Sequence, residues 1–115
     1  MKDDQLYLLH ISESLARIEE YVAEGREAFF EDSKTQDAVL RNLQTLAEST
    51  QRLSEELKAS RPEIDWRGIS GLRNILVHDY LGISLSRVWE IVEIFLPGLK
   101  TAINHWLQAW PRSDT

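Results

Sequence analysis

Two apolar stripes at helical spacing constrain the fold of this 115-residue chain more than any other feature. The first is spaced 3, 4, 3 and 4 residues apart and consists of Leu8, Ile11, Leu15, Ile18 and Val22. The second is spaced 4, 3, 4, 3 and 4 residues apart and consists of Val39, Leu43, Leu46, Thr50, Leu53 and Leu57. Each spacing places its residues on one face of an α-helix. Because no segment alternates apolar and polar residues as a half-buried strand does, the sequence predicts an all-α fold.

Local signals set the expected limits of the two long helices. The first helix should fray around residues 25–32, a segment that begins with a glycine. Ser33 and Gln36 have the spacing of a capping box, which predicts the start of the second helix. The second stripe runs to Leu57, so we expect this helix to reach that residue. Pro62 then ends the helical region, because proline cannot continue a helix.

The second half of the chain carries its own start and stop signals. Asp65 is expected to cap a third helix that runs to about Tyr80. Ser84 or Ser86 should cap a fourth helix. Residues 97–98, a proline and a glycine, are expected to kink or break this helix before it resumes over residues 99–110.

These segments predict an antiparallel bundle of four or five helices, in one domain over residues 1–115 with a loose tail at 111–115. The last third holds more large apolar side chains than one face of a small bundle requires. They include Trp89, Phe95, Trp106 and Trp110. Two interpretations stay open: these residues form the surface of a homodimer, or they close the core.

Composition excludes several classes of function. The net charge of −6 argues against indiscriminate nucleic-acid binding, and the excess acid lies in residues 1–60, whereas residues 61–115 are neutral overall. The absence of cysteine excludes a disulfide framework, a thiolate nucleophile and Cys-ligated zinc. No apolar stretch approaches the roughly 20 residues of a membrane span, and the acidic start does not resemble a signal peptide. We therefore expect a cytoplasmic protein without a membrane partner.

Reactive side chains gather between Arg73 and Tyr80, in the pattern Arg-x4-His-x-Tyr. Asn74 and His78 are four residues apart and share one helix face. Arg73 and His78 lie roughly 140° apart around an ideal helix. They can therefore act on one atom only if the helix ends near His78, or if two copies of the helix face each other across a symmetric dimer.

These residue types suit RNA cleavage without a metal. The neutral imidazole of His78 can accept the proton of a ribose 2′-hydroxyl, since histidine works as both base and acid near neutral pH. Arg73 can bind phosphate oxygens and offset the charge of the transition state, and Asn74 can orient the imidazole or the sugar. The expected product is a 2′,3′-cyclic phosphate. His10 and His105 have no zinc-type spacing with His78, so we expect neither metal nor cofactor.

A purely structural interpretation of the same residues also stays open. A lone histidine on a helix is more often a structural or surface group than a catalyst. In such a scaffold Arg73 would pair with an acid such as Glu48, and His78 would lie in a satisfied core network. Tyr80 would be a residue at a helix end with its hydroxyl in water.

A wider pattern surrounds this motif. It reads Pro62-x-Ile64-Asp65-Trp66-x-x-Ile69-x-Gly71-x-Arg73-Asn74-x-x-x-His78-x-Tyr80. The pattern resembles the signature of the HepT-type toxins, small helical ribonucleases of the HEPN superfamily. The similarity extends to residues 30–57, 88–89 and 96–97, and so covers nearly the whole chain. One departure is the sequence Leu-Ala-Glu-Ser at residues 46–49, where relatives commonly have Ile-Gly-Glu-Ala.

The resemblance implies a HEPN-like bundle that forms a homodimer, with both motif copies lining a shared cleft. It implies RNA cleavage by Arg73 and His78, with Asn74 as their polar neighbour. It also implies a type VII toxin–antitoxin system, in which an MntA-like minimal nucleotidyltransferase antitoxin transfers AMP from ATP to Tyr80. The AMP phosphates would then compete with RNA for Arg73. The alternative is a non-catalytic helical partner, or substrate-binding subunit, of a nucleotidyltransferase.

Overall fold

The computed structural model describes residues 2–110, which fold almost entirely into helices. In chain order the elements are α1 (Lys2–Tyr21), α2 (Arg26–Glu31), α3 (Ser33–Gln51), α4 (Glu55–Ala59), α5 (Trp66–His78), the 3₁₀ turn η1 (Tyr80–Gly82), α6 (Leu85–Glu90), the π-helical turn η2 (Ile91–Phe95) and α7 (Leu96–Ala109). The loose tail expected at residues 111–115 lies outside the described residues. The all-α bundle that the sequence predicts is confirmed.

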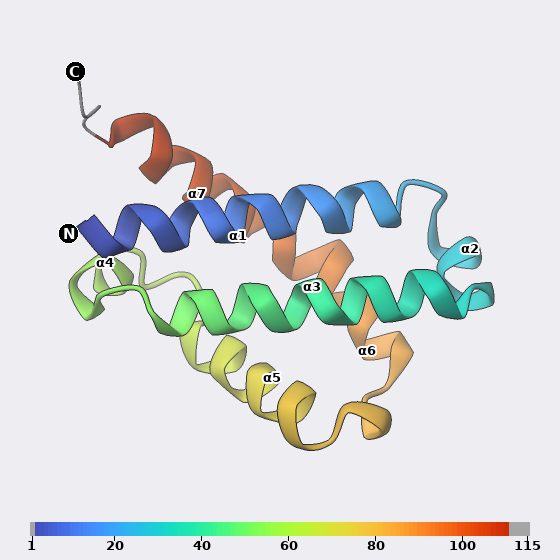
Figure 1. The fold of residues 1–115 in the computed structure, drawn as a ribbon. Coiled ribbons are helices and arrows are strands. Elements are labelled where there is room, and N and C mark those ends of the chain that lie inside the picture. Colours follow the sequence, from blue (N-terminus) through green and yellow to red (C-terminus); the bar gives the residue numbers. More distant parts are fainter. Residues whose placement is uncertain (1, 111–115) are drawn as a thin grey trace.

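The long helices α1 and α3 lie side by side and antiparallel, and the two apolar stripes meet between them (Figure 1). Leu8 and Ile11 of the first stripe are fully buried, as are Val39 and Leu43 of the second. Fully burying a side chain of this size stabilises the fold by about 1.5–3 kcal/mol. This pair is therefore the platform on which the other helices pack.

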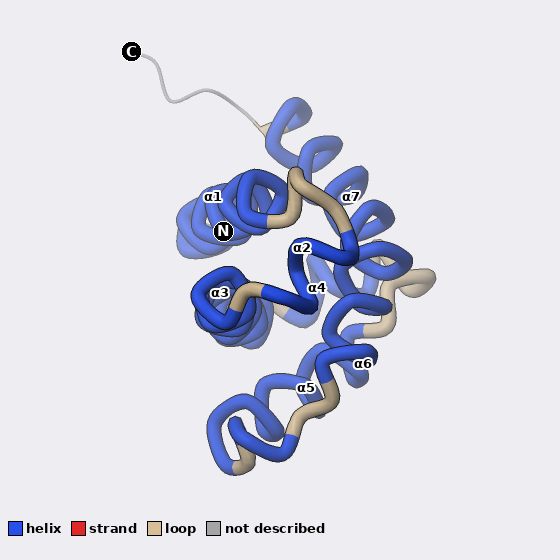
Figure 2. Tube along the Cα trace, turned by 90° about the vertical axis from the view of Figure 1, so that its right-hand side faces the viewer, coloured by secondary structure: helices blue, strands red, loops and turns tan. Residues whose placement is uncertain are grey.

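The remaining helices cover one side of this pair. Viewed from the end, α5 lies beside α3, and α7 lies against α1 (Figure 2). Helix α6 lies between α5 and α7 in this view. Lys100 Nζ of α7 donates to Glu19 Oε2 of α1 at 2.6 Å. In the part of the chain that the structure describes, no helix is both long and apolar enough to cross a membrane.

The expected fraying after α1 is wrong, because residues 26–31 fold as α2. Gly25 precedes this helix with φ of 98°, a left-handed conformation that glycine adopts without steric cost. Phe29 then anchors α2 in the core with no exposed surface. The expected capping box is also wrong. Asp32, one residue earlier, accepts from Lys34 N at 3.1 Å, and Gln36 donates to the carbonyl oxygen of Phe29 at 3.0 Å.

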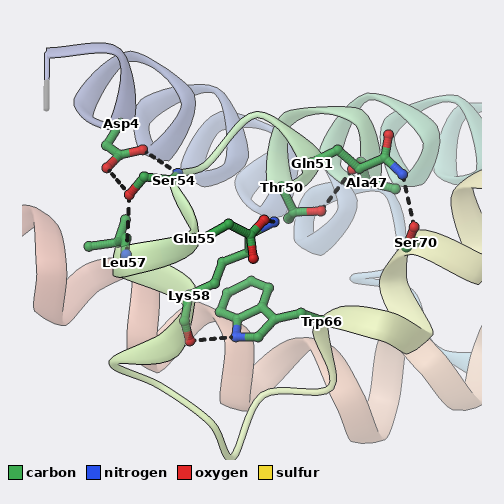
Figure 3. A network of polar contacts seen from close by, with 10 residues as sticks. All are labelled: Asp4, Ala47, Thr50, Gln51, Ser54, Glu55, Leu57, Lys58, Trp66 and Ser70. Atoms are coloured by element: carbon green, nitrogen blue, oxygen red, sulfur yellow. Dashed lines mark hydrogen bonds and ion pairs between the residues drawn. The ribbon is translucent and has the colours of Figure 1, made fainter.

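The second long helix ends earlier than the apolar stripe suggests. It stops at Gln51, and a separate helix, α4, follows after a short turn. Asp4 of α1 fixes this turn, since its carboxylate accepts from both Ser54 N and Ser54 Oγ at 2.7 Å (Figure 3). Ser54 Oγ in turn accepts from Leu57 N and caps α4. The contact between Asp4 and Ser54 therefore stabilises a turn after α3, although the apolar spacing of α3 continues to Leu57.

The helix boundaries in the second half follow the local signals more closely. Asp65 caps α5 by accepting from Gly68 N at 2.9 Å, and Ser84 caps α6 by accepting from Arg87 N at 3.3 Å. The expected interruption at residues 97–98 takes another form. The π-helical turn η2 leads directly into α7, and Pro97 lies in the first turn of that helix, where its missing N–H costs little.

Most of the large aromatic side chains of the last third pack inward. Trp89 is only 9% exposed and lies 5.4 Å from Phe29, measured between ring centroids. Trp106 stacks on Trp66 at 6.2 Å. These contacts support the interpretation in which the aromatic residues close the core. Among residues 2–110 the exposed large apolar side chains are Leu6, Leu9, Ile75, Val77, Leu81 and Ile94.

Candidate functional site

Helix α5 carries the Arg-x4-His motif and is held firmly at its N-terminal half. Trp66 Nε1 donates to the carbonyl oxygens of Lys58, at 3.0 Å, and Arg61, at 3.1 Å. Gln51 Nε2 of α3 donates to Ser70 Oγ at 3.0 Å (Figure 3). These bonds join α5 to α3 and to the segment around α4. They fix the position of the helical turn that precedes the motif.

Arg73 is half-buried on the side of α5 that faces the core. Its Nη1 donates to Asn74 Oδ1 at 3.2 Å, so the two side chains form a joined pair. The Nε of Arg73 is buried and has no partner among the described residues. Within residues 2–110 the structure records no ion pair between Arg73 and an acid such as Glu48, so the structural interpretation gains no support there.

His78 is the last residue of α5 and is exposed. The helix ends immediately after it, where Asp79 N donates to the carbonyl oxygen of Ile75 at 2.7 Å. Among the described side chains none makes a hydrogen bond to the imidazole, so both ring nitrogens can meet a substrate. This exposure contradicts the interpretation that places His78 in a core network.

Arg73 and His78 differ in their exposure on α5. Arg73 is half-buried, whereas His78 is exposed. No hydrogen bond between these two side chains is present in the described part of the chain. On an ideal helix the two residues lie roughly 140° apart, so a shared target atom requires a second helix end or a bridging substrate.

Tyr80 follows α5 in the turn η1 and is half-buried. Asp37 on α3 is near enough for its charge to act on the Tyr80 phenol. Burial raises the pKa of the Tyr80 phenol above its usual value, and the negative charge of Asp37 and a hydrogen bond to it raise that pKa further. The Tyr80 side chain is thus partly buried, whereas the structural interpretation expects its hydroxyl in water. Sequence analysis missed Asp37 because no motif spacing links residues 37 and 80, which only the packing of α3 against α5 brings together.

A groove of about 470 Å³ runs between α5 and the segment formed by α6 and η2. Its walls are mostly apolar and are lined by Gly68, Ile69, Gly71, Leu72, Ile75, Ile83, Ile91, Ile94 and Phe95. Asp65, Arg87 and Glu90 add charges of both signs to the lining. Ile94 is 69% exposed and Ile75 is 45% exposed, which is unusual for large apolar residues. Sequence patterns could not predict this groove, because its residues come from separate helices.

The family model described as "Ribonuclease HepT-like" matches residues 11–106, which include the motif, η1 and the groove. The chain belongs to the HepT-like ribonuclease family. Its fold is the all-α bundle expected of this HEPN-like group. No solved structure matches the chain.

Two curated relatives support this membership. A protein of Thermococcus cleftensis named "Probable ribonuclease HepT" is 37% identical over 82% of this chain and 86% of its own length. A Methanocaldococcus jannaschii protein named "Gamma-glutamylcyclotransferase and putative RNase" is 38% identical over 89% of this chain. The chain spans only 46% of that second, longer relative.

Proposed function

We propose that this chain is the toxin of a toxin–antitoxin system, a cytoplasmic endoribonuclease that cleaves RNA with Arg73 and His78. The observation that carries the proposal is the exposed His78 at the free end of α5, in a member of the HepT-like ribonuclease family. Residues 1–115 act as one domain in this proposal. In the described part of the chain, no group of three or more His, Asp or Glu side chains is arranged to hold a metal ion, and the proposed chemistry uses none.

The reaction needs one base and one cation. His78 takes the proton from a ribose 2′-hydroxyl, whose oxygen attacks the adjacent phosphorus while the bond to the 5′-oxygen breaks. The products are a 2′,3′-cyclic phosphate and a 5′-hydroxyl, which receives the proton. Arg73 stabilises the negative charge of the transition state through its planar N–H donors. Asn74 supports this role, because its Oδ1 accepts from Arg73 Nη1.

The proposed active form is a homodimer. On an ideal helix Arg73 and His78 lie roughly 140° apart, so in this proposal a partner copy of α5 completes the site. The apolar groove beside α5 offers a contact surface, since Ile75 and Ile94 are exposed there. Its Arg87 and Glu90 form an ion pair with each other, so these two charges do not oppose contact with a second copy.

Control of the toxin rests with an MntA-like nucleotidyltransferase antitoxin that transfers AMP to Tyr80. Tyr80 lies two residues after His78, at the same end of α5. An AMP group there carries a phosphate that competes with RNA for Arg73. Modification therefore blocks substrate binding and leaves the fold intact.

The decisive experiment combines intact mass with an RNA cleavage assay, on protein expressed with and without an MntA-like enzyme. Unmodified protein should cleave RNA and withstand chelation of metals, and protein carrying AMP on Tyr80 should not cleave. His78→Ala should abolish cleavage, whereas His10→Ala, which removes another exposed histidine, should leave it unchanged. Equal cleavage by His78→Ala and the unsubstituted protein would refute the assignment.

The second candidate function is a non-catalytic partner or substrate-binding subunit of a nucleotidyltransferase. The net charge of −6 favours it, because an acidic surface repels RNA. In that case verified unmodified protein would bind the nucleotidyltransferase, cleave no RNA and cause no toxicity in a host.

A further inference from the structure

Two side chains link the first half of α5 to other parts of the bundle (Figure 3). Trp66 Nε1 donates to the carbonyl oxygen of Lys58 at 3.0 Å, and Gln51 Nε2 of α3 donates to Ser70 Oγ at 3.0 Å. Neither link takes part in the proposed chemistry of RNA cleavage. Both restrain the helix that carries Arg73, and they do so from different directions.

The indole of Trp66 is restrained at its edge and on its face. Its Nε1 also donates to the carbonyl oxygen of Arg61 at 3.1 Å, so the N–H is shared between two carbonyl groups of the segment before α5. The ring stacks on Trp106 of α7, with 6.2 Å between ring centroids and 21° between ring planes. The first turn of α5 is therefore fixed against the segment around α4 and against α7.

The guanidinium of Arg73 has no comparable link to another helix. Among the described residues its one hydrogen-bond partner is Asn74, which lies on α5 itself. No ion pair joins Arg73 to an acid in this part of the chain. The place of the guanidinium therefore depends on how α5 as a whole is set in the bundle.

Trp66 and Arg73 occupy nearly the same side of α5. They are seven residues apart, which places them about 20° apart around an ideal helix. Ser70 lies one turn before Arg73. A rotation of α5 by about 10° would move a group about 6 Å from the helix axis by about 1 Å. A displacement of that size can reduce an enzymatic rate about a hundredfold.

We infer that Trp66 and Gln51 are positioning residues for RNA cleavage, because their bonds set the rotation of α5 and with it the place of Arg73. The inference rests on the proposed function, since it concerns the same reaction. In it neither side chain touches the RNA or moves a proton. Both act through α5, by holding Arg73 where the negative charge of the transition state develops.

The test applies one substitution to two tryptophans. Trp66→Phe keeps an aromatic ring beside Trp106 but removes the N–H that donates to two backbone carbonyls. Trp89→Phe is the matched control, because Trp89 lies on α6 and its Nε1 has no partner among the described residues. Trp89 is buried whereas Trp66 is half-buried. The control should therefore lower the midpoint of urea unfolding at least as much.

The kinetics of RNA cleavage should separate these two variants. With both folded, Trp66→Phe should lower kcat about ten- to a hundredfold, with KM changed by less than about twofold, because the lost interaction belongs to the transition state. The pH profile of kcat should keep its shape, since His78 still supplies the base. Trp89→Phe should keep kcat within about twofold of the unsubstituted protein.

Gln51→Ala is a second variant that leaves the apolar core intact, because its bond to Ser70 is exposed. It should lower kcat about three- to tenfold, less than Trp66→Phe, because the indole still holds the first turn of α5. Gln44→Ala is its control. Gln44 lies on the same helix α3 and makes no hydrogen bond to α5 in the described part of the chain, so its substitution should leave kcat unchanged.

The outcomes separate this inference from the function beneath it. Loss of kcat in Trp66→Phe and Gln51→Ala, with both controls active, supports the positioning role. If folded Trp66→Phe cleaves as fast as the unsubstituted protein, or if Trp89→Phe loses as much kcat, the role is wrong. If Trp66→Phe does not fold, equal kcat for Gln51→Ala and Gln44→Ala overturns it instead. If the unsubstituted protein cleaves no RNA, the proposed function is wrong and the inference falls with it.

Discussion

At the scale of single residues, the guanidinium of Arg73 is distinguished by its shape as well as its charge. Its Nη1 is joined to Asn74, and the planar fork can hold two phosphate oxygens at once. Lysine keeps the charge but loses this fork. We expect Arg73→Lys to reduce kcat for RNA cleavage about a hundredfold, the order found when one transition-state donor is lost. Arg67→Lys, on the same helix and exposed, is the matched control, and an equal effect of both substitutions would count against a special role for Arg73.

The raised pKa of the Tyr80 phenol predicts how stability changes at alkaline pH. Its pKa is raised by burial and by Asp37, so the folded state favours the neutral phenol. This contribution to stability is complete below the unfolded pKa of about 10 and is lost as pH rises through the higher folded pKa. Absorbance of tyrosinate should show one group titrating above the usual range, absent in Tyr80→Phe. Asp37→Asn should lower that pKa, and an unchanged titration would mean that the two side chains do not interact in solution.

Residues that act locally could be predicted from sequence, and residues that act through packing could not. Asp65 and Ser84 cap their helices as expected, because an N-cap bonds to a backbone N–H only three residues away. Asp32 and not Ser33 caps α3, where its carboxylate accepts from Lys34 N and from Thr35 Oγ1. Aspartate and serine both serve as N-caps, so the sequence alone does not decide between them. Asp37 carries no local signal, since its partner is distant in sequence.

At the scale of helices, the bond network between α1 and the start of α4 makes a sharp prediction. Asp4 is 3% exposed and accepts two hydrogen bonds from Ser54 (Figure 3). Asp4→Ala leaves the Ser54 N–H without this acceptor and should lower the free energy of unfolding by about 1–3 kcal/mol. Asp3→Ala, an exposed acid in the same turn, should change it by less than about 0.5 kcal/mol. Urea unfolding measures the free energy of unfolding of both variants. Equal changes in the two variants would show that the bonds between Asp4 and Ser54 do not stabilise the fold.

Helix continuity also shows where periodicity misleads. The second apolar stripe runs unbroken from Val39 to Leu57, yet α3 ends at Gln51 because Asp4 captures the following turn. The opposite occurs near Pro97, where helical signals stop but the helical path continues through η2. Apolar spacing predicts which residues face the core, and both stripes do face it. It does not predict whether the backbone stays helical along the whole stripe.

At the scale of the whole molecule, the apolar groove predicts how two copies associate. Ile94 lines the groove and is 69% exposed in the single chain. Ile94→Glu should weaken dimerisation by about 2 kcal/mol or more, roughly thirtyfold, because it places a charge in a desolvated contact. Leu6→Glu alters a similarly exposed residue of α1 and should leave association unchanged. Analytical ultracentrifugation measures the dimer dissociation constant of both variants. If Ile94→Glu leaves this constant unchanged, the dimer interface does not include the groove.

The roughly 140° between Arg73 and His78 around an ideal helix predicts that each cleavage site takes one residue from each protomer. Arg73→Ala and His78→Ala homodimers should then both be inactive. A heterodimer of the two variants retains one site with both residues intact, so a co-expressed equal mixture should recover roughly a quarter of the unsubstituted activity, given random pairing. Two affinity tags allow the heterodimer to be purified and its cleavage of RNA measured directly. If the verified heterodimer is as inactive as its parents, each site draws Arg73 and His78 from one chain, and the substrate itself must bridge the two faces of α5.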